Sequence, residues 1–261
     1  MNKVKNVLVT GGLGGIGLNI CKLFIKKNHN LVIVDNIPKK YFSKRLSDHS
    51  ITNKKNTILY KKIDLTKTSQ IKNLFQQLKR KFSSIDILIN CAGIQYVSSV
   101  ENFSEKMWEK VMSINLSSSF YTSKYAIPLM KKNKWGRIIN IASTHGLVAS
   151  VNKSGYVASK HGMIGLTKTI ALETATLPIT CNAICPGWVD TPLVSKQINQ
   201  RVKKNKSSRK KEEFNLLKEK QPNLSFIKGK DVAALAYFLC TDEAKDITGS
   251  SINIDGGWTS Q

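Results

Sequence analysis

The sequence is poor in arginine and in acidic residues, and both shortages bear on its possible partners. Lys and Arg number 41, of which only 5 are Arg, against 17 Asp and Glu, so the formal net charge is +24. Arginine recognises phosphates and base edges with a planar fork, so a dedicated nucleic-acid surface should contain more of it. Lys, Asn and Ile, whose codons are AT-rich, number 36, 21 and 27. We therefore expect the charge to reflect compositional bias; a polyanionic partner and the steering of a small anion are the alternatives.

Long apolar runs are also missing. Runs such as 31–34 have the length of a strand, and none approaches the roughly 20 apolar residues that a helix needs to span a bilayer. The run 7–9 passes directly into a glycine cluster, which leaves no room for the apolar stretch of a secretory leader. The sequence thus predicts neither a membrane span nor a leader.

Cysteine and histidine are too few and too scattered for a disulfide framework or a metal centre. The five cysteines are odd in number, and the four histidines show no ligand-type spacing. Cys181 and Cys185 are the nearest pair, but four residues of a strand span about 13 Å, too far for a disulfide or a shared metal. We expect reduced thiols, a cytoplasmic setting and no bound metal.

Short apolar runs alternate with longer amphipathic stretches along the chain. Continuous apolar strands predict burial on both faces, as in a parallel sheet covered by helices. Strand–helix alternation with right-handed crossovers then predicts an α/β fold, a Rossmann-type doubly wound sheet of seven parallel strands with helices on both faces, in a single domain over 1–261. We predict strands at 7–10, 31–35, 57–63, 85–90, 137–142, 179–184 and 251–254, and helices near 15–27, 68–82, 104–132, 155–176 and 230–241.

The segment 191–222 interrupts this alternation. It has no strand pattern, and it carries ten Lys or Arg and three Glu between Lys196 and Lys220. Loops this long in compact domains usually carry function. Because the segment follows the sixth strand, we expect it to overhang the carboxyl edge of the sheet, where ligands bind in such folds. Apolar residues within it, such as Ile198 and Leu216, predict a mobile helical lid over a substrate site.

A glycine cluster, Thr10-Gly11-Gly12-Leu13-Gly14-Gly15-Ile16-Gly17, follows the first predicted strand and opens the first helix. Glycines permit a tight turn and the close approach of a pyrophosphate, which binds free N–H groups at the positive end of a helix. Asp35 ends the second strand, at the position of an acid that binds a ribose 2′-hydroxyl. Its charge would repel a 2′-phosphate, so NAD is favoured over NADP, although Lys39 and Lys40 follow closely and would soften that preference.

A second pattern is Tyr156-Val157-Ala158-Ser159-Lys160. Residues four apart lie on one face of a helix, so Tyr156 and Lys160 project together. A free tyrosine has a pKa near 10, and a neighbouring ammonium favours the phenolate. We expect this neighbour to lower the pKa of Tyr156, which would make it a general acid/base for an alcohol or a carbonyl.

The two patterns occur in one order and spacing with Asn90-Cys91-Ala92-Gly93, Asn115, Ser143 and Pro186-Gly187. In this the chain resembles the short-chain dehydrogenase/reductase family over its whole length. The resemblance implies an NAD-dependent enzyme in which Tyr156 transfers a proton and Ser143 positions the carbonyl oxygen. It also implies that Lys160 binds the nicotinamide ribose and tunes Tyr156, while Asn115 holds a relay water.

The same resemblance implies the cofactor contacts. It places Asp64 against the adenine, Asn90 beside the adenosine ribose and Thr191 against the nicotinamide amide. The full set of implied NAD contacts is Thr10, Gly11, Gly15, Ile16, Gly17, Asp35, Asp64, Leu65, Asn90, Ala92, Gly93, Tyr156, Lys160, Pro186, Gly187, Val189 and Thr191.

Further motifs resemble one branch of the family, the bacterial D-3-hydroxybutyrate dehydrogenases. These are Gly93-Ile94-Gln95, 143–148, Lys160-His161-Gly162, 185–194, 219–222 and 255–258. The branch implies a substrate that touches Ser143 and Tyr156 at its reacting end. Its carboxylate would be held by Gln95, His145, Lys153 and Gln197, with Trp188 and Trp258 shaping the pocket. A carboxylate taken out of water needs a charge partner and several donors, and these residues provide them.

The resemblance therefore implies that a homotetramer interconverts (R)-3-hydroxybutyrate and acetoacetate with NAD, without a nucleic-acid or membrane partner. Two alternatives stay open. One is another reductase of the family, acting on a carrier-bound 3-oxoacyl group; a basic surface would suit its carrier, but Asp35 disfavours NADPH. The other is a non-catalytic dinucleotide sensor or nucleic-acid binder that uses the +24 charge, against which the intact Asn115–Ser143–Tyr156–Lys160 set argues.

Overall fold

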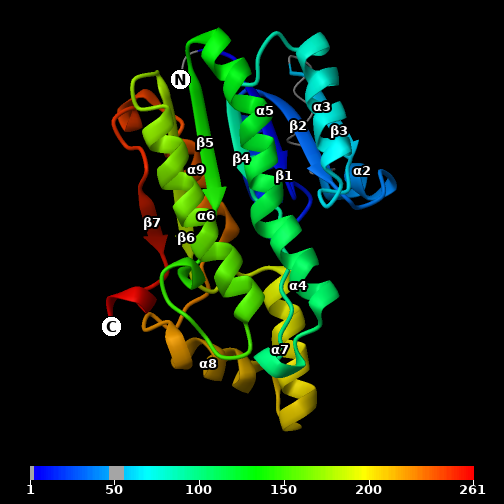
Figure 1. Cartoon of the computed structure of the whole chain (residues 1–261). Helices are drawn as coiled ribbons and strands as arrows, with labels where there is room; N and C mark the ends of the chain where they lie inside the picture. The colour runs from blue at the N-terminus through cyan, green and yellow to red at the C-terminus, as the bar shows by residue number, and fades with distance from the viewer. Residues whose placement is uncertain (1–2, 47–55) are drawn as a thin grey trace.

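A parallel sheet forms the centre of the fold, with helices on both of its faces (Figure 1). The computed structural model of the chain describes residues 3–46 and 56–261. Within them the sheet has seven strands in the order β3-β2-β1-β4-β5-β6-β7, and every pairing is parallel. The strands are β1 (Asn6–Thr10), β2 (Asn30–Asp35), β3 (Ile58–Lys62), β4 (Ile87–Asn90), β5 (Gly136–Ile141), β6 (Ile179–Pro186) and β7 (Ser251–Ile254). The predicted doubly wound seven-stranded sheet is confirmed.

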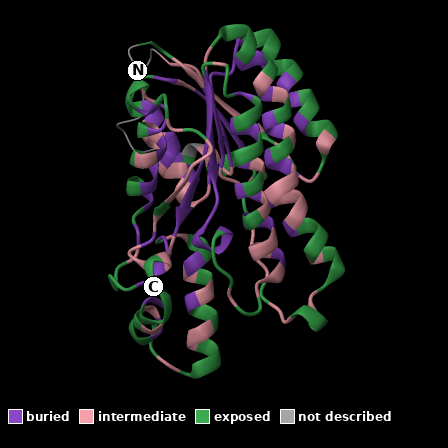
Figure 2. Ribbon diagram, turned by 60° about the vertical axis from the view of Figure 1, so that its left-hand side comes forward, coloured by how far each residue is buried: buried purple, intermediate pink, exposed green. Residues whose placement is uncertain are grey.

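Alternate residues of each central strand face opposite helical layers. Val7 and Val9 pack with α1 (Gly15–Lys26) and α9 (Gly229–Phe238), while Leu8 packs with the other layer. That layer consists of α3 (Thr68–Lys81), α5 (Ser118–Asn133) and α6 (Ser154–Glu173). Figure 2 shows the strands buried between helices whose outer surfaces are exposed.

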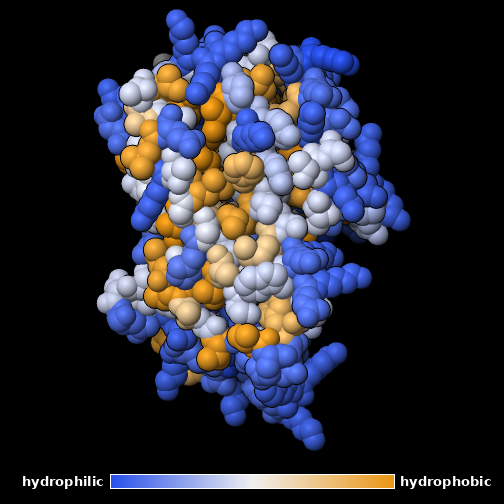
Figure 3. Space-filling model, viewed as in Figure 1, coloured by the Kyte–Doolittle hydropathy of each residue, from blue (hydrophilic) through white to orange (hydrophobic). Residues whose placement is uncertain are grey.

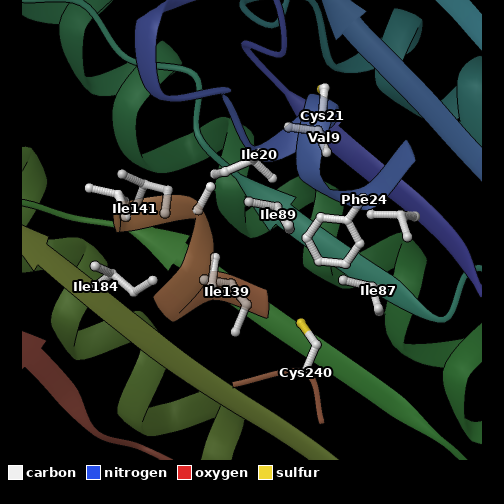
Figure 4. Close-up of a cluster of buried hydrophobic side chains, with 14 of the residues drawn as sticks. Val9, Ile20, Cys21, Phe24, Ile87, Ile89, Ile139, Ile141, Ile184 and Cys240 are labelled. Atoms are coloured by element: carbon white, nitrogen blue, oxygen red, sulfur yellow. The ribbon is translucent and has the colours of Figure 1, made fainter. Parts of the chain in front are cut away.

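The side of the core under α1 is built around one aromatic ring. Phe24 of α1 is fully buried among Ile87, Ile139 and Cys240 and their neighbours (Figure 4). Burying a side chain of this size contributes about 1.5–3 kcal/mol. The apolar strands predicted from the sequence thus form a buried core. This core positions the residues at the carboxyl edge of the sheet.

Two helical regions differ from the sequence prediction. Helix α2 (Lys40–Leu46) was not predicted, because its residues show no apolar periodicity. The helix predicted over 104–132 is α4 (Glu105–Met112), a π-helical turn over Ser113–Ser117, and α5. A π-turn adds one residue within a continuous helix, so periodicity does not reveal it. Such turns are frequent at functional sites, and Asn115 lies in this one.

The segment 191–222 forms two helices, α7 (Pro192–Asn205) and α8 (Arg209–Lys220), and no strand, as expected. Its buried residues Val194, Ile198, Leu216 and Leu217 pack against Trp188 and Trp258. On its outer side, Arg201 of α7 is hydrogen-bonded to Glu212 and Glu219 of α8. The two helices therefore form one packed unit below the carboxyl edge of the sheet (Figure 1).

In the described part of the chain, no helix combines the length and the apolar character that a membrane crossing requires.

Candidate active site

Three adjoining cavities lie at the carboxyl edge of the sheet. The glycine-loop cavity, about 410 Å³, lies between the glycine cluster, Asp35, Asp64 and the turn after β4. The tyrosine chamber, about 80 Å³, contains Tyr156 and shares Ile16, Thr191 and Leu193 with the first cavity. The outer cavity, about 620 Å³, shares Lys153, Trp188, Gln197 and Trp258 with the chamber. The chamber thus lies between the other two.

The turn of the glycine cluster packs against the chain around it only because side chains are absent. Gly11 has a φ of +63°, and a Cβ on it would lie 2.7 Å from the Cα of Ala92. A Cβ on Gly17 would lie 2.2 Å from the carbonyl oxygen of Gly11. Helix α1 begins after Gly14, which offers no side-chain cap. Its first N–H groups therefore face the cavity without a capping side chain, as pyrophosphate binding requires.

Asp35 lies at the edge of this cavity beside Leu13 of the glycine cluster. Its carboxylate accepts hydrogen bonds from the N–H groups of Leu13 at 2.9 Å and Asn36 at 2.8 Å. The side chain is buried but lines the cavity, so a negative charge meets whatever binds there.

One cation at this edge was missed by the sequence analysis. Arg45 of α2 lines the cavity and donates a hydrogen bond to the carbonyl oxygen of Leu13, whereas Lys39 and Lys40 do not line it. No motif indicated Arg45; only the small number of arginines in the chain could have drawn attention to it.

Asp64 and Asn90 differ in how they meet the cavity. Asp64 lines it, and hydrogen bonds from Thr66 lower the pKa of its carboxyl. The side chain of Asn90 points into the core instead: it donates to Asn140 at 2.8 Å and accepts from Thr122 at 2.7 Å. The structure therefore does not bring the Asn90 side chain to the cavity.

The other predicted cofactor residues divide between the two cavities. Gly11, Gly15, Ile16, Gly17, Leu65, Ala92, Gly93 and Thr191 line the glycine-loop cavity, and Tyr156, Pro186, Gly187 and Val189 line the chamber. Thr10 and Lys160 lie directly behind these surfaces. The hydroxyl of Thr10 accepts from the N–H of Cys91 at 3.1 Å, and Lys160 is almost fully buried.

Asn115 fixes the turn after β4. Its amide accepts from the N–H of Ile94 at 2.9 Å and donates to the carbonyl oxygen of Ile94 at 3.0 Å. Its nitrogen also donates to the hydroxyl of Ser159 at 3.1 Å. The Nζ of Lys160 donates to the carbonyl oxygen of Ile141 at 2.7 Å. A Cβ on Gly93 would lie within 4 Å of both Asn115 and Lys160, so these two side chains flank the same point.

The structure corrects the expected pKa of Tyr156. Burial raises the pKa of its phenol, and only a hydrogen bond with Ser143 acts in the opposite direction. Burial also lowers the pKa of Lys160 to about 8, which weakens the positive charge on which the prediction depended. The Nζ of Lys160 lies 5.7 Å from the centroid of the Tyr156 ring. The sequence showed the pair but not its desolvation.

Two amides close one side of the tyrosine chamber. Gln197 of α7 donates to the Oε1 of Gln95 at 3.1 Å. The Nε2 of Gln95 is buried and has no hydrogen-bond partner among the described residues, and the same is true of the Nε1 of Trp188. A buried donor without an acceptor costs about 1–3 kcal/mol, so this wall favours a ligand that offers oxygen atoms.

Lys153 and His145 also line the chamber. The Nζ of Lys153 lies 4.7 Å from the centroid of the Trp188 ring, and burial lowers its pKa to about 8. No carboxylate in the described residues forms a salt bridge with it. Burial and the charge of Lys153 lower the pKa of His145 to about 3, so the imidazole is neutral.

His145 is oriented by contacts on both sides. Its Nε2 and the hydroxyl of Ser150 are hydrogen-bonded at 2.9 Å, a contact that no sequence pattern indicates. The backbone N–H of His145 donates to the hydroxyl oxygen of Ser143 at 3.1 Å. The rings of Trp258 and Tyr156 pack edge-on against it at 5.2 and 5.8 Å. The chamber thus brings Ser143 and Tyr156 together with the other six residues predicted for substrate binding: Gln95, His145, Lys153, Trp188, Gln197 and Trp258.

This arrangement suits a small molecule with an oxygen-bearing carbon near Tyr156 and an anionic end near Lys153. Such a molecule would lie beside a dinucleotide in the glycine-loop cavity, because the two cavities meet at Ile16, Thr191 and Leu193.

Curated relatives cover nearly the whole chain. A D-beta-hydroxybutyrate dehydrogenase of Rhizobium meliloti (strain 1021) is 43% identical over 257 residues, which are 98% of this chain and 99% of the relative. A D-beta-hydroxybutyrate dehydrogenase of Cupriavidus necator is 42% identical over 98% of both chains.

The fold also matches solved structures. One is a 4-hydroxyisoleucine dehydrogenase complexed with NADH, 33% identical with a TM-score of 0.85 over 98% of this chain and 99% of the other. The family model of the short chain dehydrogenases matches residues 5–202. Because this match covers most of the chain and the relatives extend it to nearly full length, the chain belongs to the short chain dehydrogenase family.

Proposed function

We propose that the chain interconverts (R)-3-hydroxybutyrate and acetoacetate with NAD as the hydride carrier. The observation that carries the proposal is the composition of the tyrosine chamber: within residues 3–46 and 56–261, Lys153 forms no salt bridge with a carboxylate, and Gln95 has a buried donor without an acceptor. Both lie in one small space with Tyr156. A short acid with an oxygen at its third carbon would satisfy all three. The D-beta-hydroxybutyrate dehydrogenases at 42–43% identity support the same choice.

The residues of the glycine-loop cavity fit NAD. The tight turn that glycine permits at positions 11 and 17 exposes the uncapped start of α1, which would take the pyrophosphate. Asp35 would accept a hydrogen bond from a ribose hydroxyl and would repel a 2′-phosphate. When bound, NAD supplies the hydride acceptor and a positive ring charge that favours the phenolate of Tyr156.

Tyr156 holds the proton that the reaction moves. In the reductive direction its phenol gives a proton to the oxygen of the carbonyl as the carbon receives a hydride; in oxidation it takes the proton back. The raised pKa keeps the phenol protonated in the free chain, which suits the reductive step. The O–H of Ser143 would donate to the carbonyl oxygen of the substrate, while the Oγ of Ser143 accepts from the backbone N–H of His145.

The recognition of the acid end rests on charge. A buried carboxylate is costly unless it is paired and hydrogen-bonded. Lys153 supplies the pairing charge, and the Nε2 of Gln95 supplies a donor. The neutral imidazole of His145 adds contact without a second charge.

We further propose that the chain acts in the cytoplasm as a homotetramer, as the resemblance to the family implies. Exposed apolar side chains on α4, α5 and α6 support association: Trp108, Phe120 and Leu172 are 40%, 46% and 79% exposed. Light scattering on the protein as it elutes from a size-exclusion column measures the mass of the assembly. A monomer at assay concentration would contradict the tetramer.

Reduction assays distinguish the proposed reaction from that of a 3-oxoacyl carrier reductase. Acetoacetate with NADH should turn over and yield 3-hydroxybutyrate. An acetoacetyl thioester with NADPH should be turned over far more slowly, because Asp35 opposes the phosphate and Lys153 lacks its carboxylate. The opposite preference would refute the proposal.

A further inference from the structure

The outer cavity is the largest of the three and is not accounted for by the reaction itself. It opens between α7, α8 and the loop 149–153, and it meets the chamber at four shared residues, Lys153, Trp188, Gln197 and Trp258. On its other side the chamber meets the glycine-loop cavity, where the dinucleotide would lie. A substrate that arrives after the dinucleotide would therefore come through the outer cavity.

The walls of the outer cavity carry more positive than negative charge. Four cations line it, Lys153, Arg201, Lys204 and Lys220, and one acid, Glu219. Arg201 is already paired with Glu219 and Glu212. Lys204 and Lys220 have no salt bridge among the described residues. Their charges are therefore uncompensated at the mouth of the chamber.

The floor of this cavity is apolar. Trp188, Trp258 and Leu216 form its inner side, and Val97 and Val151 line its outer side although they are 51% and 86% exposed. Figure 3 shows long hydrophilic side chains around the lower end of the molecule, over α7 and α8. A cavity with cations at its rim and apolar side chains on its floor suits a small aliphatic anion.

We propose that the outer cavity is a vestibule in which Lys204 and Lys220 capture small aliphatic carboxylates before these pass to Lys153. The proposal rests on the proposed function, because it assigns the path of that substrate. The charges at this rim already act on the chamber: Lys220 helps to lower the pKa of His145 and of Lys153, while Glu219 raises that of Lys153. Because Glu219 is paired with Arg201, Lys204 and Lys220 are the charges left to attract a carboxylate.

The helices offer a matched control. Lys203 precedes Lys204 in the last turn of α7, and Lys218 lies with Lys220 in the last turn of α8. All four side chains are exposed, but only Lys204 and Lys220 line the cavity. The double variants K204Q/K220Q and K203Q/K218Q therefore remove the same charge from the same helix ends, and they differ only in whether that charge faces the vestibule.

The test compares kcat/KM for (R)-3-hydroxybutyrate between these two variants at low ionic strength. K204Q/K220Q should lose about 3- to 10-fold in kcat/KM with kcat unchanged, while K203Q/K218Q stays near the parent. The difference should disappear near 1 M salt, where the Debye length is about 3 Å. Equal losses in both variants, or no loss in either, would overturn the vestibule.

A second readout works without turnover. Acetate, as a non-reacting carboxylate, should quench or shift the tryptophan fluorescence of the NAD-bound chain through Trp188 and Trp258. Its apparent Kd should rise in K204Q/K220Q and not in K203Q/K218Q; the same Kd in both would overturn the vestibule. A chain that binds acetate in this pattern but does not oxidise (R)-3-hydroxybutyrate would refute the proposed function and leave the vestibule standing.

Discussion

Gln197 donates a 3.1 Å hydrogen bond to Gln95, a residue that lies 102 positions earlier in the chain. The bond joins α7 to the turn after β4 and uses the oxygen of the Gln95 amide, so its nitrogen is left buried without an acceptor. The helix pair α7–α8 and the sheet thus meet at a donor that a bound ligand would satisfy.

Replacing Gln95 by Met should raise the KM for (R)-3-hydroxybutyrate about 10-fold with little change in kcat, because one hydrogen bond of about 1–1.5 kcal/mol is lost. Met keeps the length of the side chain but offers no donor. Steady-state kinetics at saturating NAD measure the change. An unaltered KM would mean that the Gln95 amide does not face the substrate.

Replacing Tyr156 by Phe should lower kcat by a factor of about 10²–10⁴, the usual contribution of a positioned acid or base. The substitution leaves the buried ring in place and removes only the hydroxyl that shares a hydrogen bond with Ser143. NAD affinity, measured by fluorescence titration, should stay near that of the parent. A Phe variant with parental turnover would remove Tyr156 from the mechanism.

The pH dependence of kcat/KM should report the charge of Lys153. Burial lowers its pKa to about 8, so the ammonium is present below this pH and is lost as the pH rises through it. We expect kcat/KM to fall above about pH 8, because a neutral amine does not pair with a carboxylate. The fall of kcat should begin at a higher pH than the fall of kcat/KM, because a bound carboxylate raises the pKa of Lys153 in the complex.

Lys160 has a similar pKa, about 8, so a variant must separate the two lysines. In K153R the guanidinium keeps its charge across this range, and KM should become independent of pH up to about 10. If KM still rises above pH 8 in K153R, the titration belongs to another group.

Asp35 should decide between the two dinucleotides. D35S keeps an oxygen that can accept from Leu13 but removes the charge. The ratio of kcat/KM for NADP to that for NAD should rise at least about 10-fold, and Arg45 at the same end of the cavity should strengthen the gain. D64S is the control, because the contact implied for Asp64 is with the adenine that both cofactors share. An equal change of the ratio in both variants would contradict the role of Asp35.

Strand positions could be predicted because they depend on local composition. Apolar runs such as 31–34 and 87–89 are buried on both faces, and each lies in a strand of the sheet. Helix α2 had no such signal, since Lys40–Leu46 mixes basic, aromatic and polar residues without a period. The division of 191–222 into two helices was not predicted, although Ser208 accepts a hydrogen bond from the N–H of Lys211 as the N-cap of α8, and serine is a common N-cap.

The site was harder to predict where the outcome depended on three-dimensional burial. The sequence placed Tyr156 and Lys160 on one helix face, but the pKa of each followed from the loss of water around it. The direction of the Asn90 side chain followed from its partners Asn140 and Thr122, which lie 50 and 32 residues away. Spacing along a chain carries no information on such contacts.

The most direct measurement of the central claim is NADH formation from NAD with each enantiomer of 3-hydroxybutyrate, with acetoacetate identified as the product. A chamber that fixes the carboxylate at Lys153 and the hydroxyl at Tyr156 leaves only one face of the third carbon toward the dinucleotide. One enantiomer alone should therefore react: by the proposed function the R form gives NADH and acetoacetate, and the S form gives neither. Turnover of the S form alone, of both forms equally, or of neither would contradict this account.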